Sequence, residues 1–335
     1  MGARCRCKVS VPLIRGADVC SLSRRILKAS HHPDYFLPLP DGHPFPMAKY
    51  PLVRERLRSG GWLRAEDELV PDEAAYEDLA RVHTTGYLDR LFGDGLDAAE
   101  VRTLGVPWTP RLLRRSRLAV QGTLLAARAA LEDGMAGNLA GGTHHAFADH
   151  GEGFCVLNDV AVAIRRLQAE GAIRRALVVD LDVHQGNGTA AIFEGDDSVA
   201  TFSMHGERNY PARKMRSTLD VGLPDGTDDD GYLAALAAHL PRLLQGFAPD
   251  LVFYLAGVDV AAGDRYGRFS LSDAGLRERE RQVLGWARAR GLPMVVTLAG
   301  GYAASAERTA ELHAMVFEEA AILTGHPALR ENCGA

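Results

Sequence analysis

The sequence predicts a single α/β domain with a parallel sheet and helices on both faces. From about residue 134, short apolar runs rich in Val, Leu and Phe alternate with longer segments that repeat apolar residues every three or four positions. The first pattern is typical of buried parallel strands and the second of amphipathic helices. Strands that alternate with helices form a parallel sheet covered by helices. No repeat or long linker divides the 335 residues, so one domain is expected.

The expected elements follow one another along the chain. Apolar runs predict strands within 135–142, 175–184, 198–205, 250–259 and 293–302. Helical periodicity predicts helices over 112–131, 160–167, 232–244, 276–289 and 306–323. Two of these helices are preceded by residue types favoured at N-caps, namely Ser272-Asp273 and Asp229-Asp230.

The bulk composition is typical of a soluble globular protein and limits the partners. Hydrophobic residues make up 47% of the chain, charged residues 24%, and the formal net charge is −5. A net negative charge gives no general attraction for nucleic acid, and the arginines within 111–117 are interpreted as the solvated face of a helix. The sequence contains no apolar run of the ~18 residues that a transmembrane helix needs. It does not indicate an oligomeric state.

The cysteines and the first residues bear on location. Five cysteines at irregular spacings predict no disulfide framework, which suits a reducing, cytoplasmic setting. Residues 1–28 are rich in Arg, Ser and Cys and contain one acidic residue, Asp18. This composition suits a transit peptide, and it equally suits an additional strand and helix or a disordered leader.

The stretch LVVDLDVHQGNG, residues 177–188, spaces Asp180, Asp182 and His184 two positions apart. Side chains of an extended strand alternate between its faces, so these three are expected to point the same way. Two interpretations are open for this stretch alone. It is either a solvated strand end with polar residues or a metal site that lacks one ligand.

Four of the expected strands end in residues suited to metal binding or acid–base chemistry: His144 and His145, Asp182 and His184, Asp259, and Tyr302. In open parallel α/β sheets, binding sites form outside the carboxyl ends of the strands. The four segments are therefore expected to converge in one crevice, and this convergence favours the metal site.

Asp182, His184 and Asp259 are the expected ligands of one divalent metal ion. Two carboxylates and one imidazole leave a position open for water or substrate, as a catalytic zinc requires. The remaining carboxylate, Asp180, is expected either to make a strand-end hydrogen bond or to accept a hydrogen bond from a histidine ring and fix its tautomer.

Three further residues suit chemistry beside a metal ion. His144 and His145 are candidates for the general base that activates water and the acid that protonates the leaving amine. Tyr302, after two glycines, presents a hydroxyl to the oxyanion formed when an amide carbonyl is attacked. Alone, a histidine pair is usually incidental and such a tyrosine is usually a half-buried ring. Together with the metal ligands they predict metal-assisted amide hydrolysis.

Four segments in this order resemble the zinc-dependent histone deacetylase family: GGTHHAFADHGEGFCVLNDVAVA, VVDLDVHQGNGT, YLAGVDVAAGDRYGRFSLS and LAGGY. The likeness is closest to the class IV branch, through DLDVHQGNG, GTDDDGYL and GDRYGRFSLS. It implies the arginase/deacetylase fold, a single domain around a mainly parallel eight-stranded sheet. The catalytic domain is then expected over 29–325, between the leader 1–28 and a tail at 326–335.

The resemblance also implies roles for particular residues. It implies zinc at Asp182, His184 and Asp259, an acid–base pair of His144 and His145 with His145 favoured as the base, and Tyr302 as the oxyanion donor. It implies substrate contacts at Gly153, Phe154, Tyr210 and Gly301, with the rings of Phe154 and Tyr210 as facing walls of an acyl-lysine tunnel. It further implies a potassium ion held by Asp180, Asp182, Ser203 and the backbone carbonyls of His184 and Met204.

Asn187 departs from the common pattern of the family, in which an aspartate is the partner of the second histidine. Class IV proteins share the asparagine. An amide oxygen accepts a hydrogen bond but brings no negative charge, so His145 lacks an anion that would favour its charged form. In Asn187→Asp, the acidic limb of kcat/KM is therefore expected to move to higher pH.

Several functions stay open at this point. The main hypothesis is a lysine deacylase that acts on acetyl-lysine, on long fatty acyl-lysine or on both, in a protein or peptide. A deacetylase of small acylated amines such as acetylpolyamines is an alternative. A ureohydrolase with two manganese ions needs a denser Asp/His cluster than the one after His184. A non-catalytic acyl-lysine binding module would be expected to lack Tyr302 or a zinc ligand, and all are present.

Overall fold

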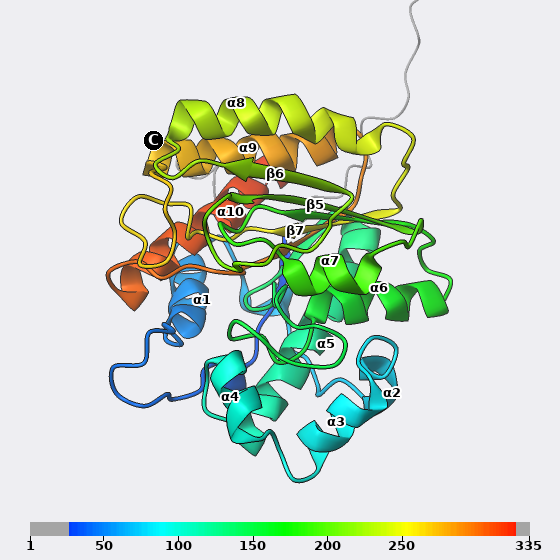
Figure 1. Cartoon of the computed structure of the whole chain (residues 1–335). Coiled ribbons are helices and arrows are strands. Elements are labelled where there is room, and N and C mark those ends of the chain that lie inside the picture. The colour runs from blue at the N-terminus through cyan, green and yellow to red at the C-terminus, as the bar shows by residue number, and fades with distance from the viewer. Residues whose placement is uncertain (1–26, 326–335) are drawn as a thin grey trace, which may run out of the picture.

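The computed structural model describes residues 27–325, and these form an eight-stranded sheet (Figure 1). The strands lie in the order β2-β1-β3-β8-β7-β4-β5-β6, and every neighbouring pair is parallel. They are β1 (Lys28–Ser30), β2 (Glu68–Leu69), β3 (Met135–Asn138), β4 (Ala176–Asp180), β5 (Val199–Gly206), β6 (Leu219–Leu223), β7 (Leu251–Leu255) and β8 (Met294–Thr297). This confirms the predicted sheet. The predicted tail lies outside the described residues, and so does the predicted leader except for Leu27, which is buried, and Lys28, which begins β1.

Helices cover both faces of the sheet (Figure 1), as predicted. One layer contains α5, α6 and α7, and the other contains α1, α8, α9 and α10. The helices are α1 (Lys49–Ser59), α2 (Tyr76–Leu79), α3 (Thr85–Phe92), α4 (Ala98–Leu104), α5 (Pro110–Asp133), α6 (Asp159–Ala169), α7 (Asn187–Phe193), α8 (Asp229–His239), α9 (Asp273–Arg288) and α10 (Ala306–Thr324). Short 3-10 helices span Pro33–Tyr35, Ala65–Asp67 and Leu240–Leu244.

The central strands are apolar along their whole length because both of their faces are buried. In β4, Leu177 and Val179 join the hydrophobic cluster on one side of the sheet, whereas Ala176 and Val178 join the cluster on the other. Such strands read as continuous apolar runs, which is why the sequence pattern located them. Periodicity did not locate β1 and β2, which are only two or three residues long, or β6, whose alternate residues are exposed at the sheet edge.

Two predicted helix boundaries differ from the structure. The N-cap of α8 is Asp228, whose side chain accepts from the amide of Gly231, so Asp229 and Asp230 lie in the first turn instead. The same helix ends at His239, and the expected continuation to residue 244 is a 3-10 helix. Pro241 accounts for this change, because proline has no amide hydrogen to donate to the carbonyl four residues earlier and its ring clashes with that turn of an α-helix.

The arginines of 111–117 do not form one solvated face. Arg115 is buried, and its Nε donates to the carbonyl of Tyr35 at 2.8 Å. Arg114 and Arg117 both pair with Glu73. The interpretation as a solvated face is therefore wrong for Arg115, because helical geometry turns this position toward the interior while its neighbours reach the surface.

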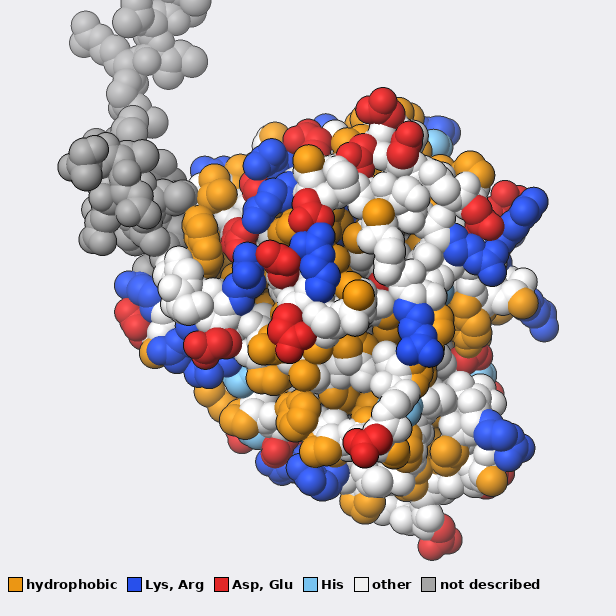
Figure 2. All heavy atoms as spheres, turned by 90° about the vertical axis from the view of Figure 1, so that its left-hand side faces the viewer, with side chains coloured by type: hydrophobic (Ala, Val, Ile, Leu, Met, Phe, Trp, Pro, Cys, Tyr) orange, Lys and Arg blue, Asp and Glu red, His pale blue; other side chains and the backbone are white. Residues whose placement is uncertain are grey.

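The charges on the described surface are mixed where Figure 2 displays them. Acidic and basic side chains are interspersed over this face, with hydrophobic side chains between them (Figure 2). Among residues 27–325, no helix is both long and apolar enough to cross a membrane.

Candidate active site

The predicted site residues lie at one edge of the sheet, after four neighbouring strands, β3, β8, β7 and β4. The loop after β3 carries His144 and His145, and the loop after β8 carries Tyr302. The loops after β7 and β4 carry the expected metal ligands. The carboxyl ends of parallel strands share one edge, so the strand order explains why segments more than a hundred residues apart meet there.

Asp182, His184 and Asp259 are buried, and their ligand atoms lie within 4.8 Å of one another. Nδ1 of His184 is 2.9 Å from Oδ1 of Asp182 and 3.2 Å from Oδ2 of Asp259. Within the described part of the chain, Oδ2 of Asp259 is a buried oxygen without a hydrogen-bond donor. Burying such a charge is costly unless a cation binds it. The three residues therefore fit a divalent metal ion.

The local backbone brings these ligands together by a turn and not by strand alternation. Strand β4 ends at Asp180, whose Oδ1 accepts from the amide of Asp182 at 3.1 Å. Oδ1 of Asp182 in turn accepts from the amide of His184 at 2.9 Å. Asp side chains commonly bond to the backbone two residues further on and so initiate turns. The prediction of an extended strand through 184 is therefore wrong, although Asp180 and Asp182 both face the ring of His144.

Two glycines leave room for the carboxylates of this site. A Cβ on Gly300 would lie 2.1 Å from Oδ2 of Asp259 and 2.5 Å from Oδ2 of Asp182. A Cβ on Gly257 would lie 2.6 Å from the same oxygen of Asp182. The amide of Gly300 also donates to Oδ2 of Asp182 at 2.6 Å. Glycine is required at both positions because any side chain would occupy the space of the ligand oxygens.

The two adjacent histidines have different partners. Nδ1 of His144 lies 2.7 Å from Oδ2 of Asp180. Nδ1 of His145 lies 2.6 Å from Oδ1 of Asn187 at the start of α7. Both rings are buried, with their centroids 4.1 Å apart. Asp180, the carboxylate outside the metal group, is thus the partner of the first histidine, and a neutral amide is the partner of the second.

These partners set opposite acid–base properties. Burial alone lowers the pKa of His144, but the carboxylates of Asp180 and Asp182 outweigh it and raise the pKa to about 9. Burial, and then the neighbouring rings of His144 and His184, hold the pKa of His145 well below its ordinary value. His145 is therefore the ring that is neutral, and able to accept a proton, at neutral pH.

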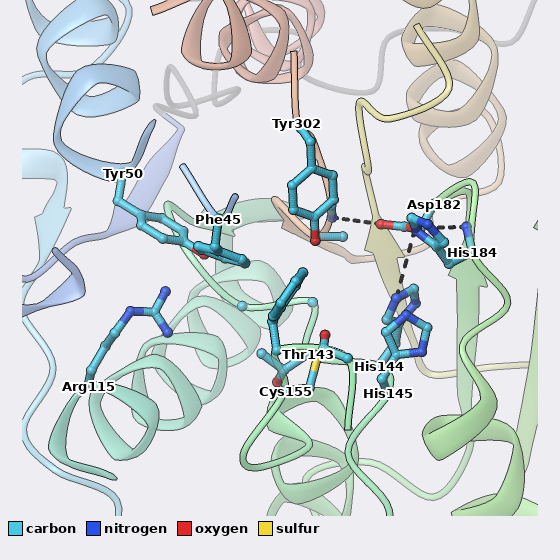
Figure 3. A pocket seen from close by; sticks show the side chains of 16 residues that line it. Phe45, Tyr50, Arg115, Thr143, His144, His145, Cys155, Asp182, His184 and Tyr302 are labelled. Atoms are coloured by element: carbon cyan, nitrogen blue, oxygen red, sulfur yellow. Dashed lines mark hydrogen bonds and ion pairs between the residues drawn. The ribbon is translucent and has the colours of Figure 1, made fainter. Parts of the chain in front are cut away.

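Tyr302 faces this group across the pocket, with its hydroxyl pointing into it (Figure 3). Its amide donates to Oδ2 of Asp264 at 2.6 Å, which fixes the loop after β8. Burial, followed by the carboxylates of Asp182 and Asp259, raises the pKa of the Tyr302 hydroxyl well above its ordinary value. The hydroxyl therefore keeps its proton and is available as a hydrogen-bond donor.

Two cavities meet at these side chains. The outer cavity, of about 260 Å³, opens to the surface between the rings of Phe154 and Tyr210, and Gly153 lines it as well. The inner cavity, of about 30 Å³, lies among the histidines, Asp182 and Tyr302. Gly301 is not among the residues that line either cavity, and a Cβ there would meet Val258 at 2.5 Å. Its expected contact with substrate stays a prediction.

The residues expected around a potassium ion lie side by side. Asp180 and Ser203 are register partners on β4 and β5, and Met204 follows on β5. Asp182 and His184 lie in the turn that continues from Asp180. All five residues are buried. Oγ of Ser203 lies 2.9 Å from Nδ1 of His205.

Sequence reasoning missed three charged residues that hold the site loops: Asp159 and Arg279 are buried, and Asp264 is half-buried. Asp159 accepts from the amides of Gly142 and Thr143 at 3.1 and 2.8 Å, before the histidine pair. Asp264 accepts from the amide of Tyr302. Arg279 of α9 donates to the carbonyls of residues 181 and 257, beside the metal group, at 3.2 and 2.7 Å. The apolar periodicity of α9 indicates which face of the helix is buried, but it does not indicate that a buried arginine holds the site loops.

Comparison with known proteins identifies relatives over most of the chain. The model of the histone deacetylase domain matches residues 43–319. An uncharacterized protein of Picosynechococcus is 46% identical over 87% of this chain and 97% of its own length. Histone deacetylase 2 of Arabidopsis thaliana is 33% identical over 84% of this chain and 76% of its own.

Two further comparisons agree with this family. A histone deacetylase-like amidohydrolase of Pseudomonas aeruginosa is 32% identical over 76% of this chain and 72% of its own. The crystal structure of the HDA15 HD domain superposes with a TM-score of 0.71 at 24% identity, and the match covers 90% of this chain and 92% of that one. The structural likeness extends to the whole α/β domain and its eight-stranded sheet.

Proposed function

The chain belongs to the histone deacetylase family of amide hydrolases, and we propose that it is a zinc-dependent lysine deacylase that acts on acetyl-lysine. The observation that supports this most strongly is the convergence of three buried metal-binding side chains, two histidines and a tyrosine hydroxyl at the foot of one tunnel. Metal ligands, a general base and an oxyanion donor are the groups that amide hydrolysis needs.

Each side chain has one part in this chemistry. Asp182, His184 and Asp259 hold the zinc, which supplies Lewis acidity to the amide carbonyl and to water. His145 accepts the proton of the attacking water, and a histidine returns a proton to the leaving amine nitrogen. Tyr302 donates a hydrogen bond to the carbonyl oxygen as negative charge develops on it.

The size of the inner cavity favours a small acyl group. Its volume of about 30 Å³ accommodates one or two water-sized groups and leaves no space for a long hydrocarbon chain. The rings of Phe154 and Tyr210 line the outer tunnel, which suits the apolar stem of lysine. We therefore propose acetyl-lysine as the preferred substrate over fatty acyl-lysine.

The charges at the tunnel mouth favour a peptide over a polyamine. Arg102 and Arg213 line the groove beside the tunnel, together with Glu152 and His150. Two arginines next to one carboxylate offer little attraction to a polycationic amine. An acylated lysine in a peptide brings no further positive charge of its own, so it is the substrate that this mouth suits better.

A potassium ion is proposed beside the zinc. The buried oxygens of Asp180, Asp182 and Ser203, with the carbonyls of His184 and Met204, form a set of hard donors that suits such a cation. Its part would be structural, because it would neutralise buried carboxylates that shape the turn after β4.

A panel of lysine peptides that carry acyl groups from acetyl to myristoyl tests the proposal. Zinc content is measured on the same sample, with an acetylpolyamine as the competing substrate. We expect one zinc per chain, loss of activity with a chelator, recovery with zinc, and the highest kcat/KM for acetyl-lysine. Full activity of a metal-free sample would refute the hydrolytic mechanism, and a preference for myristoyl would refute the choice of acyl group.

A further inference from the structure

Glu152 accepts a hydrogen bond from Asn187, the residue that contacts the proposed base His145. Nδ2 of Asn187 donates to Oε1 of Glu152 at 2.9 Å, while Oδ1 of the same amide lies 2.6 Å from Nδ1 of His145. The hydroxyl of Tyr210, on the tunnel wall, donates to the same Oε1. A single carboxylate therefore joins the residue behind the histidine to the wall of the substrate tunnel.

The carboxylate decides which way the amide of Asn187 faces. An ionised carboxylate can only accept hydrogen bonds, so the group that faces it has to be the NH₂ of the amide. If the amide were reversed, its oxygen would lie against a carboxylate oxygen at 2.9 Å. In the observed orientation, the amide oxygen faces His145 and can only accept, so the proton of the imidazole has to reside on Nδ1.

We propose that Glu152 is a positioning residue that fixes the tautomer of His145 by fixing the orientation of the Asn187 amide. With the proton held on Nδ1, Nε2 is the nitrogen that is free to accept a proton in the site. This inference rests on the proposed function only in that His145 is the base. The orientation of the amide and the tautomer are properties of this chain with or without turnover.

The backbone holds Glu152 where this function needs it. Its amide donates to the carbonyl of Cys155 at 3.1 Å, and the amide of Cys155 donates back at 2.9 Å. Between them, Gly153 has a φ of 53° and Phe154 a φ of 69°. A Cβ on Gly153 would meet the ring of His145 at 2.6 Å. The tight turn thus packs directly against the histidine whose tautomer Glu152 controls, and strained backbone of this kind persists where the surroundings enforce it.

The charges around Glu152 keep it ionised. Nε2 of His150 lies 3.6 Å from its Oε2, and Arg102 and Arg213 line the same groove. Partial burial raises the pKa of Glu152, but the interactions with His150, Tyr210 and Asn187 outweigh it and leave the pKa below its ordinary value. An ionised Glu152 offers only acceptors to Asn187, which is the condition that the argument needs.

The tautomer of His145 can be measured directly by ¹⁵N NMR on zinc-loaded protein with labelled histidine. In the wild type, we expect a proton on Nδ1 and none on Nε2. In Glu152→Leu, nothing holds the NH₂ of Asn187 outward, so a second population with the proton on Nε2 should appear. Glu152→Gln keeps an acceptor oxygen and should restore most of the Nδ1 form. Tyr210→Phe removes another hydrogen bond to Glu152 and should leave the tautomer unchanged.

Activity and metal content separate this inference from the proposed function. Glu152→Leu should lower kcat about tenfold or more, a part of the ~10²–10⁴-fold that a general base contributes, with zinc content unchanged and with partial rescue in Glu152→Gln. An unchanged tautomer in Glu152→Leu would overturn the inference, whatever the activity. A shifted tautomer in a protein that hydrolyses no acyl-lysine would support the inference and overturn the proposed function.

Discussion

The imidazole of His144 and the carboxylate of Asp180 form a buried charged pair, with 2.7 Å between Nδ1 and Oδ2. The next residue in the chain, His145, contacts the neutral amide of Asn187 in the equivalent way. The pKa of His144 is therefore raised above the ordinary value of a histidine, whereas the pKa of His145 is lowered below it. The environment thus makes one histidine a charged group and the other a neutral base, which is how a pair of titratable groups divides acid and base roles.

The first prediction concerns the pH dependence of the reaction. The pKa of His145 lies well below its ordinary value, so the ring loses its proton at lower pH than a free histidine does. The acidic limb of kcat/KM should accordingly lie below pH ~6.5, the pKa of an unperturbed histidine. Initial rates on one acetyl-lysine peptide between pH 4.5 and about 8, at constant ionic strength, check this. A limb above pH ~7 would mean that another group acts as the base.

Removal of the Tyr302 hydroxyl should slow the reaction without loss of zinc. The hydroxyl is proposed to donate only when charge develops on the carbonyl oxygen, so Tyr302→Phe should lower kcat by ~10²–10³-fold. Tyr266→Phe is the matched control, because that ring lies 4.9 Å from Tyr302 and lines the same tunnel. Retention of more than about a third of wild-type kcat in Tyr302→Phe would exclude the oxyanion role.

Gly300→Ala should disrupt metal binding. The added Cβ would lie 2.1 Å from Oδ2 of Asp259, so the carboxylate would have to move away from the metal group. We expect the zinc content to fall well below one per chain. Gly285→Ala on α9 has no neighbour within 4 Å of its Cβ and serves as the control. It should keep zinc and raise the free energy of unfolding by about 0.5–1 kcal/mol, because alanine favours the helix. Equal zinc content in the two variants would contradict the requirement for glycine at position 300.

The sequence predicted the elements that have strong local signals. Apolar runs such as 177–179 located the central strands, because both faces of each strand are buried. The polar ends of those strands gave the metal ligands, the histidine pair and Tyr302. The order of the strands is set by packing between segments far apart in the chain, and no local pattern encodes it.

What the sequence did not predict depends on contacts between distant residues. Glu152, Asn187 and Tyr210 lie in separate segments, and only the fold brings their side chains within hydrogen-bond distance. Arg115 and Arg279 occupy helical positions whose residue type is typical of the surface. Both are buried because backbone carbonyls in other segments accept their protons, and a helix pattern carries no information about such acceptors.

Arg279 should be among the most costly residues to remove. Its guanidinium is fully buried, bonds to the carbonyls of residues 181 and 257, and pairs with Glu280 at 2.5 Å. Arg279→Leu removes the charged partner of the buried Glu280, so the free energy of unfolding should fall by about 3–5 kcal/mol. Arg281→Leu, two residues along the same helix, removes a side chain that is 56% exposed and pairs with Glu319. It should cost about 1 kcal/mol or less. Similar denaturation midpoints for the two variants would contradict the proposed contribution of Arg279 to stability.

The last prediction moves the charge of Glu152 one residue closer to His145. In Asn187→Asp alone, the new carboxylate would face Glu152 where an NH₂ now donates at 2.9 Å. One of the two acids would then bind a proton, so the effect on His145 would be small. The shift that the sequence predicts for this single variant is revised accordingly, because the sequence did not place Glu152 beside Asn187. Combining Asn187→Asp with Glu152→Gln keeps the net charge, and the new amide at 152 can donate to the new carboxylate at 187. A carboxylate beside Nδ1 favours the charged imidazole and commonly raises its pKa by ~1–3 units. His145 would then hold its proton to higher pH, and the acidic limb of kcat/KM should move up while the zinc content stays unchanged.

The wild type, both single variants and the double variant are compared on one substrate at one ionic strength. A limb that stays in place or moves down in the double variant would show that Asn187 does not act on the catalytic base, and it would leave Asn187 as a residue that only starts α7.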